Sequence, residues 1–463
     1  MMRVLLVVYD NDSYIQWFPQ GLAYIAAVLK KNGIYVEIFN QDIHHYPDSY
    51  LTDYINQNNF DVVGISIIAG YYQYRKVLSL SDAINKSEKR PFYILGGHGP
   101  APVPEFFFKK THADAIVIGE GEETIIDLLS AVFHKKNLQN VKGIAYRENG
   151  TTVINQRREL IQDIDTIPFP AYELFPMEVY RLLRMPHCSK SDFVFPMLSG
   201  RGCTFKCNFC YRLDKGFRPR STESIIEEIK LLKENYRITY IAFSDELLMS
   251  SIGRTIELCE AFIKNNLDIK WDCNGRLNYA KPHVLQLMKK AGCVFINYGI
   301  EAFDDQILKN MNKGLTTKQI VKGIEATLKV GISPGFNIIF GNIGEDRTTL
   351  QKGVEFLLKY DDGAQLRTIR PVTGYPGTDL FRYAIENGLL KDAEDFYENK
   401  HINSDLVAVN YTDMTDDEFH LALLEANETL LTNYHNKKLN SLLQQTRNLY
   451  INKDANFRGY RHT

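Results

Sequence analysis

In the first third of the chain, two kinds of segment alternate: short apolar runs, and stretches in which apolar residues recur with helical spacing. The apolar runs have the length of buried strands, and they lie at Arg3–Tyr9, Val36–Asn40, Asp61–Ile68, Phe92–Leu95 and Ala115–Ile118. Stretches such as QGLAYIAAVLKKNG and ETIIDLLSAVFHKK have helical periodicity. This alternation predicts an α/β domain with a doubly wound (Rossmann-like) parallel sheet, which binds ligands at the carboxyl ends of its strands.

A second alternation of the same kind begins at Phe193. Its expected strands lie at 193–199, 239–244, 269–274, 293–299, 335–341 and 364–370. Helical stretches such as STESIIEEIKLLKENY separate them, and Ser221 and Thr222 are candidate N-caps. Six β/α units predict a partial TIM-like (β/α)6 barrel, with its chemistry at the carboxyl ends of the strands.

The segment between the two alternations has the features of a connector. GIAYRENGTTVINQ predicts a hairpin that turns at Asn149 and Gly150, and DTIPFPAYELFP contains prolines that prevent a continuous helix. From about Tyr375 onward, helical spacing predominates. We therefore expect a first domain of residues 1–137, a connector of 138–190, a barrel of 191–374 and a mainly helical C-terminal region of 375–463.

Composition narrows the possible functions. The 463 residues are 44% hydrophobic and 24% charged, and the formal net charge of −2 gives no basic footprint for nucleic acid. No apolar run has the length of a membrane span, and the apolar run at the N-terminus is too short for a signal peptide. We therefore expect a cytoplasmic protein that binds neither nucleic acid nor membrane, in which clustered thiols indicate a metal or catalysis rather than disulfides.

Three of the seven cysteines cluster just after the first expected barrel strand, in SGRGCTFKCNFCYR. Cys203, Cys207 and Cys210 suit two kinds of metal centre. A structural zinc site needs a fourth ligand, which His187 or Cys188 could supply, although the matched pairs of short spacings typical of zinc sites are absent. An iron–sulfur cubane held by three thiolates keeps one iron open for reaction.

The other cysteines carry no assigned chemistry. Cys259 lies on an expected helix, and Cys273 and Cys293 lie in expected strands, where a free cysteine behaves as a small buried hydrophobe. The role of Cys188 stays open.

The CxxxCxxC arrangement after a first barrel strand resembles the radical S-adenosylmethionine (radical SAM) superfamily, whose [4Fe–4S] cluster binds the methionine part of the cosubstrate at its fourth iron. The resemblance implies that Phe209 lies near adenine, and that Asp245 and Glu246 of FSDELL hold the methionine ammonium. Read without the resemblance, either carboxylate could cap the next helix.

Further barrel positions match the same superfamily. The resemblance implies that Glu301 of NYGIEAF meets the ribose and that Gly341 of GFNIIFGNIGED lies along the adenine. Gly341 could equally be a turn at the end of a strand. Arg276 of CNGRLN could pair with a carboxylate of the cosubstrate or with a neighbouring acidic side chain.

Small residues also follow three strands of the first domain, at SIIAG, GGHGP and GEGEE. Each set could form tight turns or let the backbone approach a nucleotide, a flavin or a corrinoid. Over nearly the whole chain, this domain followed by the barrel resembles the cobalamin-binding radical SAM family. The resemblance implies a set of cobalamin contacts: Ser66, Gly96, Gly97, Gly119, Glu120 and Gly121.

One departure from many cobalamin proteins follows the first strand. YDNDSYIQWFPQG contains no histidine to serve as the axial ligand of cobalt. Two alternatives remain: a corrinoid whose lower face is open or holds water, and a domain that has kept the fold and lost the ligand. The rim glycines favour the first.

The resemblance implies an enzyme that uses a [4Fe–4S] cluster, S-adenosylmethionine and cobalamin. The 5′-deoxyadenosyl radical would abstract hydrogen from an unactivated carbon of a small-molecule or natural-product substrate, and methylcobalamin would supply a methyl group. A flavodoxin- or ferredoxin-type protein would supply electrons. The alternatives are a non-methylating radical enzyme (cyclase, ring-contracting enzyme or dehydratase/deoxygenase of an alcohol or amino sugar) and a non-catalytic corrinoid/iron–sulfur sensor.

Overall fold

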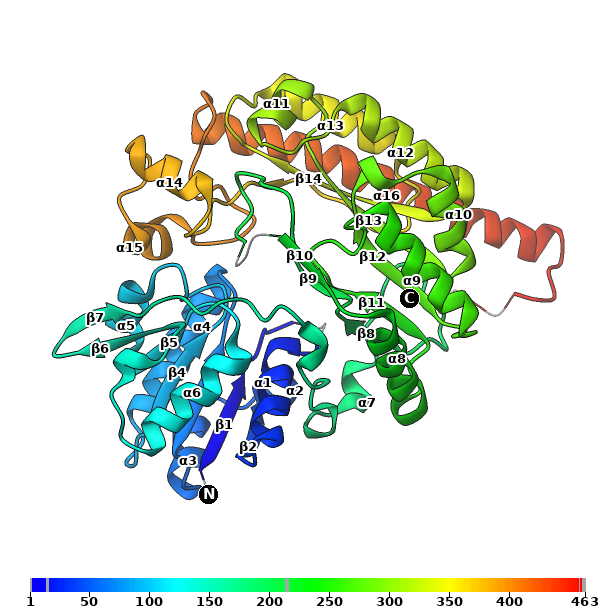
Figure 1. Ribbon diagram of the computed structural model, residues 1–463. Coiled ribbons are helices and arrows are strands. Elements are labelled where there is room, and N and C mark those ends of the chain that lie inside the picture. The colour runs from blue at the N-terminus through cyan, green and yellow to red at the C-terminus, as the bar shows by residue number, and fades with distance from the viewer. Residues whose placement is uncertain (1, 14–15, 213–215, 458, 460–463) are drawn as a thin grey trace.

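The computed structural model describes residues 2–13, 16–212, 216–457 and 459. Two α/β units lie side by side, and the C-terminal helices lie against both (Figure 1). The first unit is the blue and cyan part of the chain, and the second is the green and yellow part. This arrangement confirms the predicted fold class.

The first unit is a seven-stranded sheet with the order β2-β1-β3-β4-β5-β6-β7. Its strands are β1 (Arg3–Val8), β2 (Tyr35–Asn40), β3 (Val62–Ser66), β4 (Phe92–Gly96), β5 (Ala115–Val117), β6 (Ile144–Glu148) and β7 (Thr151–Ile154). Its helices are α1 (Gln20–Lys31), α2 (Gln41–His44), α3 (Asp48–Gln57), α4 (Tyr71–Asn85), α5 (Pro104–Thr111) and α6 (Gly121–Phe133). Strands β1 to β5 are parallel, as predicted.

Both faces of this sheet are buried, which explains the continuous apolar run of β1. Leu6 and Val8 face the core that α1 and α6 cover, whereas Leu5 and Val7 face the core under α3, α4 and α5. A parallel sheet covered by helices on both sides requires apolar residues at consecutive positions.

The hairpin that we expected in the connector belongs to this sheet instead. Strand β6 pairs antiparallel with β5, and β7 pairs with β6. Without the hairpin, the backbone of β5 would be an open edge, and pairing satisfies those groups. We therefore propose that the first domain extends to Ile154 rather than to residue 137. The rest of the connector forms only short helical turns, such as α7 (Met177–Tyr180).

The second unit contains a six-stranded parallel sheet with the order β15-β14-β13-β12-β11-β8. Its strands are β8 (Val194–Met197), β11 (Tyr240–Phe243), β12 (Lys270–Gly275), β13 (Cys293–Glu301), β14 (Ser333–Phe340) and β15 (Arg370–Pro371). Its helices are α8 (Thr222–Tyr236), α9 (Ile252–Lys264), α10 (Pro282–Lys290), α11 (Asp305–Asn310), α12 (Thr317–Val330) and α13 (Arg347–Tyr360). The last strand begins where we expected it to end, at residue 370.

A small antiparallel ribbon that the sequence did not indicate flanks the cysteine loop. It pairs β9 (Gly200–Cys203) with β10 (Gly216–Pro219). Gly202 has a φ of +85°, and a Cβ there would lie 2.4 Å from the Gly216 carbonyl oxygen. The close pairing of the two strands therefore requires glycine at this position.

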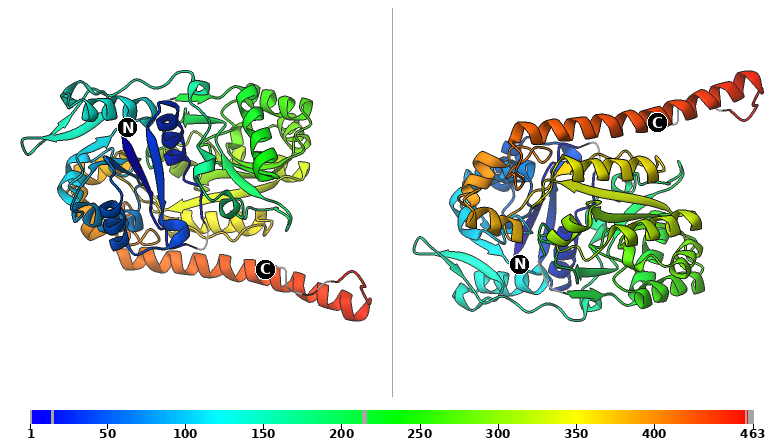
Figure 2. Two further views of the ribbon diagram at one scale, coloured as in Figure 1. Left: turned by 90° about the horizontal axis from the view of Figure 1, so that it is seen from below. Right: turned by 90° about the horizontal axis from the view of Figure 1, so that it is seen from above.

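The C-terminal region is mainly helical, as predicted, and contacts both units. Its helices are α14 (Asp379–Glu386), α15 (Ala393–Asp395), a π-helical turn (Phe396–Lys400) and α16 (Asp416–Ile451). Tyr397 packs against Tyr74 of the first domain, with ring centroids 4.8 Å apart. Phe419 of α16 stacks on Phe340 of β14 at 4.9 Å, and the helix then extends past the body of the molecule (Figure 2).

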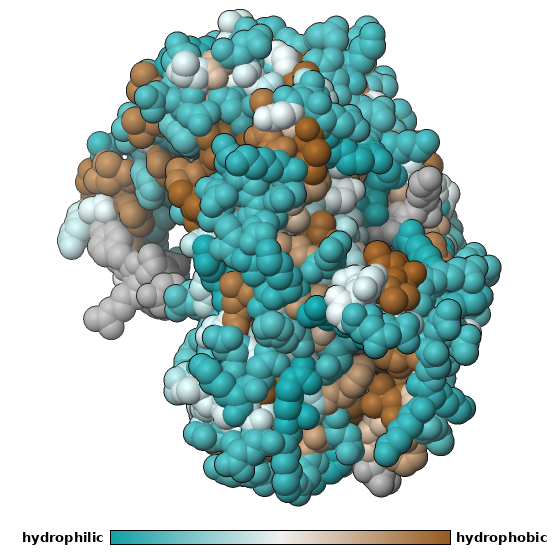
Figure 3. Space-filling model, turned by 90° about the vertical axis from the view of Figure 1, so that its left-hand side faces the viewer, coloured by the Kyte–Doolittle hydropathy of each residue, from teal (hydrophilic) through white to brown (hydrophobic). Residues whose placement is uncertain are grey.

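Hydrophilic residues cover most of the side of the molecule shown in Figure 3, and hydrophobic residues lie there in separate groups. In the part of the chain that the structure describes, none of the helices combines the length and apolar character needed to cross a bilayer.

Candidate active site

The three clustered cysteines lie at the carboxyl end of the barrel sheet. Cys203 is the last residue of β9, while Cys207 and Cys210 lie in the loop that leads toward β10. All three are free thiols; Cys203 and Cys207 are partly buried and Cys210 is exposed. Residues 213–215 of the same loop lie outside the described residues.

The electrostatics of these thiols suit a cationic centre. Burial raises the pKa of Cys203, and the charges of Glu246 and Cys207 raise it further. Although Cys210 is exposed, the loss of hydration around its thiol raises its pKa to about 12, and Glu246, Cys207 and Cys203 add to the shift. Bound iron would reverse this repulsion by stabilising the thiolates.

The thiols interact electrostatically without meeting at a common point. Among the described residues, no three His, Cys, Asp or Glu side chains are grouped so that they could hold a metal ion as they stand. Cys188 lies elsewhere, packed beside Leu183, Val194 and Tyr240, while Cys259, Cys273 and Cys293 are buried as expected.

The two acidic residues after β11 occupy different environments. Asp245 is 1% exposed, and its carboxylate accepts hydrogen bonds from the Ser199 backbone N–H and Oγ at 2.9 to 3.0 Å. Burial raises its pKa to about 6. Glu246 is exposed and lines the cavity between the domains, within electrostatic reach of Cys203 and Cys210. Asp245 therefore joins the ends of β8 and β11, whereas Glu246 faces the cavity.

Arg276 lies beside the cysteine loop. Its guanidinium carbon is 3.3 Å from the centre of the Phe205 ring, and the side chain hydrogen-bonds to Cys207. Burial lowers its pKa, while the nearby Cys207 and Cys203 act in the opposite direction. Among the described residues, its buried Nε and Nη2 have no hydrogen-bond partner. Buried donors without a partner make Arg276 a candidate for binding an anionic group.

Glu301 ends β13 in an unusual backbone conformation. Its φ is +71°, which is uncommon for a residue other than glycine and costs conformational energy. The register between β13 and β14 shifts at this point. Its carboxylate pairs with Lys313 Nζ at 2.8 Å, and Lys313 Nζ lies 6.0 Å from the centre of the Phe209 ring. The structure thus brings two of the predicted cosubstrate contacts, Phe209 and Glu301, to one end of the sheet.

Gly341 has a clear packing role. Its φ is +99°, and a Cβ there would lie 2.5 Å from the ring of Phe419. Its backbone N–H donates to Glu345 at 2.8 Å. The turn at the end of β14 and the approach of α16 therefore account for the glycine without a ligand.

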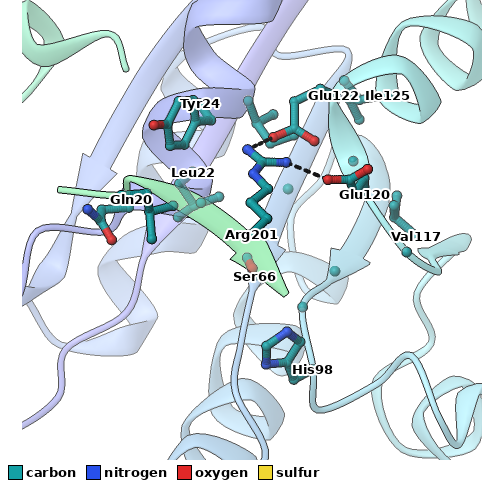
Figure 4. A pocket seen from close by; sticks show the side chains of 18 of the residues that line it. Gln20, Leu22, Tyr24, Ser66, His98, Val117, Glu120, Glu122, Ile125 and Arg201 are labelled. Carbon is teal, nitrogen blue, oxygen red and sulfur yellow. Dashed lines mark hydrogen bonds and ion pairs between the residues drawn. The ribbon is translucent and has the colours of Figure 1, made fainter. Parts of the chain in front are cut away.

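A cavity of about 400 Å³ lies between the two units (Figure 4). From the first domain, its lining includes α1, the carboxyl ends of β3 and β4 (Ser66 and Gly96) and the turns after β4 and β5, Gly119 among them. From the second unit, it includes the β9–β10 ribbon, Ser244 and Glu246. The carboxyl ends of both sheets therefore face one space.

The rim glycines divide into two kinds. A Cβ on Gly97 would lie 2.3 Å from the Ile67 carbonyl oxygen, so backbone packing explains this glycine, whereas one on Gly121 would approach the end of the flexible Ile25 side chain at 2.9 Å. A Cβ on Gly96 would approach only Val117, at 4.0 Å, and one on Gly119 would meet nothing within 4 Å. At Gly96, neither a left-handed φ nor packing requires glycine, which favours a ligand that lies against the backbone. This lining fits the expected corrinoid.

Glu120 has a partner that the sequence did not suggest. Its carboxylate binds Arg201 at 2.9 Å and Arg218 at 2.9 and 3.0 Å, both on the β9–β10 ribbon. Those charge-assisted hydrogen bonds lower its pKa against the opposing effect of burial. The residue that we expected to contact cobalamin therefore connects the two domains.

Sequence reasoning also missed His98, Arg201 and Arg218. His98 lines the cavity, and its ring lies 5.4 Å from that of Tyr211, the residue after Cys210. Burial lowers its pKa, so the ring is neutral near pH 7. Arg201 lies two positions before Cys203, so its place in the cysteine segment was the available signal.

Comparisons with known proteins agree with this architecture. The family model described as the B12 binding domain matches residues 7–129, and that of the Radical SAM superfamily matches residues 197–357. The chain is 31% identical over 402 residues to an uncharacterized methyltransferase of Pyrococcus horikoshii, covering 84% of both chains. It is 27% identical over 380 residues to the anaerobic magnesium-protoporphyrin IX monomethyl ester cyclase of Rubrivivax gelatinosus, covering 79% of this chain and 66% of that one.

A similar solved structure is that of the radical S-adenosylmethionine methyltransferase TsrM from Kitasatospora setae with cobalamin and a [4Fe–4S] cluster bound. It superimposes with a TM-score of 0.74 at 16% identity and covers 93% of this chain and 89% of that one. The matched domains confirm the predicted cofactors of the family: the cluster, S-adenosylmethionine and cobalamin. The chain belongs to the cobalamin-binding family of the radical S-adenosylmethionine superfamily.

Proposed function

We propose that this chain is a cobalamin-dependent radical SAM methyltransferase that acts on an unactivated carbon of a small-molecule substrate. The observation that carries the proposal is the shared cavity, because Gly96 of the first domain and Glu246 of the barrel line the same space. A methyl donor on one side and a radical generator on the other could then reach one substrate.

In this proposal, Cys203, Cys207 and Cys210 hold the cluster. Their position at the end of β8 and β9 and their mutual repulsion as thiolates support it. When bound, the cluster and S-adenosylmethionine would supply the deoxyadenosyl radical that takes a hydrogen atom from the substrate, and cobalamin would supply the methyl group. The protein's part is to bind, orient and shield these groups.

Glu246 is the residue that we assign to the methionine ammonium, because it faces the cavity near the thiols. Arg276 takes the methionine carboxylate, since its buried Nε and Nη2 need acceptors. Phe209 and Glu301 form the nucleoside side of the site. Lys313 connects them, because it pairs with Glu301 and lies near the Phe209 ring. Asp245 does not contact the cosubstrate in this proposal; it supports the site by accepting hydrogen bonds from Ser199.

Ser66, Gly96, Gly97 and Gly119 form the cobalamin side. Gly96 and Gly119 leave backbone open toward the cavity, and Gly97 lies against Ser66 and Ile67. A one-electron donor of the flavodoxin or ferredoxin type would reduce the cluster, because SAM cleavage consumes an electron that the chain itself does not supply.

The test is anaerobic incubation of the reconstituted holoenzyme with S-adenosylmethionine deuterated in its methyl group and an extract of the host cell. We expect a product heavier by one labelled methyl group, formed only when both cluster and cobalamin are present. Formation of 5′-deoxyadenosine without any labelled product would contradict methyl transfer and favour a cyclase, ring contraction or dehydration. Absence of SAM cleavage under strong reductant would favour the sensor.

A further inference from the structure

Four charged side chains form a connected network across the domain interface. Glu120 and Glu122 come from the turn after β5 and the first turn of α6, and Arg201 and Arg218 come from the β9–β10 ribbon. Arg201 lies between both carboxylates, with Nη1 2.9 Å from Glu120 Oε1 and Nη2 2.6 Å from Glu122 Oε1 (Figure 4). Arg218 reaches the same Glu120 with two nitrogens. We call these four residues the clasp.

The clasp is largely removed from solvent. The side chains of Glu120 and Glu122 are 6% and 8% exposed, and those of Arg218 and Arg201 are 14% and 19% exposed. The two carboxylates carry two negative charges and the two guanidiniums two positive charges. These charges neutralise one another only when the two domains hold their present relative position. A buried charge that loses its partner is costly, which makes the arrangement sensitive to small displacements.

Each end of the clasp is continuous with one cofactor site. Arg201 lies in β9, two residues before Cys203, the first proposed cluster ligand. Glu120 is flanked by Gly119 and Gly121 in the turn that lines the cobalamin side of the cavity. A planar guanidinium bound to two carboxylates fixes distance and orientation, which a lysine ammonium cannot do.

We propose that the clasp positions the cluster loop relative to the corrinoid turn, and that Arg201 is its central positioning residue. The proposal goes beyond the assignment of cofactor ligands, because none of the four residues needs to touch a cofactor. It rests on the proposed function only in that both cofactors are bound to one chain.

The same helix offers a matched control. Arg158 of the connector pairs with Asp127 and Glu123 of α6 in a guanidinium–carboxylate network of the same kind. Both of those carboxylates are more than half exposed, and neither lines the cavity. Arg158→Lys therefore perturbs an Arg–carboxylate pair on α6 without touching the clasp.

The experiment compares wild type, Arg201→Lys, Glu122→Gln and Arg158→Lys as holoenzymes, with iron and cobalt measured in each. The readout is the magnetic interaction between Co(II) and the reduced cluster, by pulsed electron paramagnetic resonance, which requires no substrate and no turnover. In wild type and in Arg158→Lys, we expect a single narrow distribution of the strength of the Co(II)–cluster interaction. In Arg201→Lys and Glu122→Gln, we expect this distribution to be broadened or shifted at similar cofactor content.

With the substrate identified by the labelled-methyl assay, the amount of methylated product per 5′-deoxyadenosine should fall about 10- to 100-fold in Arg201→Lys, because an ångström of misplacement has effects of this size. An unchanged Co(II)–cluster interaction in both clasp variants would overturn the proposal. Loss of cobalamin from Arg201→Lys with an unchanged cluster would also overturn it, since Arg201 would then be a ligand contact. If wild type forms no methylated product, the proposed function fails, while the magnetic measurement still tests the clasp.

Discussion

Neutralising the two acidic residues after β11 one at a time should have different effects: one variant should change cosubstrate binding and the other the pH dependence of stability. Asp245→Asn and Glu246→Gln each remove one negative charge with little change of shape. Asp245 is buried against Ser199, whereas Glu246 faces the cavity beside the cysteine loop. We expect Glu246→Gln to weaken S-adenosylmethionine binding and Asp245→Asn to leave it nearly unchanged.

The size of the first effect follows from the lost partner of an ammonium group. A hydrogen bond to a charged group contributes about 1.5–3 kcal/mol, which corresponds to about a 10- to 150-fold weaker affinity in Glu246→Gln. In Asp245→Asn, the amide oxygen can still accept from Ser199, so we expect a change in affinity below about 3-fold, or about 0.7 kcal/mol.

The substitution of Asp245 should instead change how the free energy of unfolding depends on pH. Its pKa is raised from 3.8 to about 6, so the folded protein binds a proton that the unfolded chain has lost over this range. The contribution of Asp245 to stability therefore falls as pH rises from about 4 to about 6, by roughly 3 kcal/mol. The amide introduced by Asp245→Asn does not titrate, so the difference in unfolding free energy between wild type and this variant should change by this order across the same window.

The assays are equilibrium binding of S-adenosylmethionine to reconstituted protein, the yield of 5′-deoxyadenosine, and denaturant unfolding at pH 4, 5, 6 and 7. Iron content should match wild type in both variants, because neither side chain is a proposed ligand. Equal weakening by the two substitutions, or no weakening by Glu246→Gln, would refute the division of roles.

Three further outcomes follow from the same structure. Replacing all three clustered cysteines by alanine should abolish the iron–sulfur absorbance, while Cys259→Ala should retain it; full iron retention in the triple variant would rule out these ligands. Gly97→Ala should destabilise the protein by more than about 1 kcal/mol and reduce cobalamin binding, because its φ is +92° and a Cβ would meet the Ile67 carbonyl oxygen at 2.3 Å. Gly33→Ala, with φ +70° and nothing within 4 Å, is the control, and equal effects of the two on unfolding and on cobalamin binding would contradict the argument. Bound Co(II) cobalamin should show no nitrogen superhyperfine splitting, and a splitting that disappears in His98→Ala would identify that ring as an axial ligand.

Most strands of the two large sheets could be predicted because each carries its own apolar run, whereas β15 (Arg370–Pro371) has none and was expected at 364–370. Val4 to Val8 is buried on both faces, so the pattern of β1 is determined locally and the structure places it where the sequence indicated. The β9–β10 ribbon could not be predicted in this way, since GRGC and GFRP contain no apolar run. Its pairing depends on Gly202, which lies against the Gly216 carbonyl oxygen of the other strand, and this contact is not visible in the local sequence.

The cysteine cluster was recognisable because its three thiols are close in sequence. The partner of Glu120 was not, because Arg201 lies 81 residues away and meets it only when the two domains come together. Asp245 and Glu246 are adjacent in sequence but differ in burial, a distinction that depends on Ser199, 46 residues away. The need for glycine at position 341 was also hidden, because the side chain that approaches it, Phe419, comes from a helix near the end of the chain.

The central claim is that cobalamin binds in the cavity between the two units and that the cluster binds beside it, at the three thiols near Glu246 on the barrel side. The most direct measurement is anomalous diffraction at the iron and cobalt edges from crystals of the anaerobically reconstituted holoenzyme. We predict an iron peak beside Cys203, Cys207 and Cys210, and a single cobalt peak in the cavity between Gly96 and Gly202. A cobalt peak outside this cavity, or iron bound away from these thiols, would contradict the account.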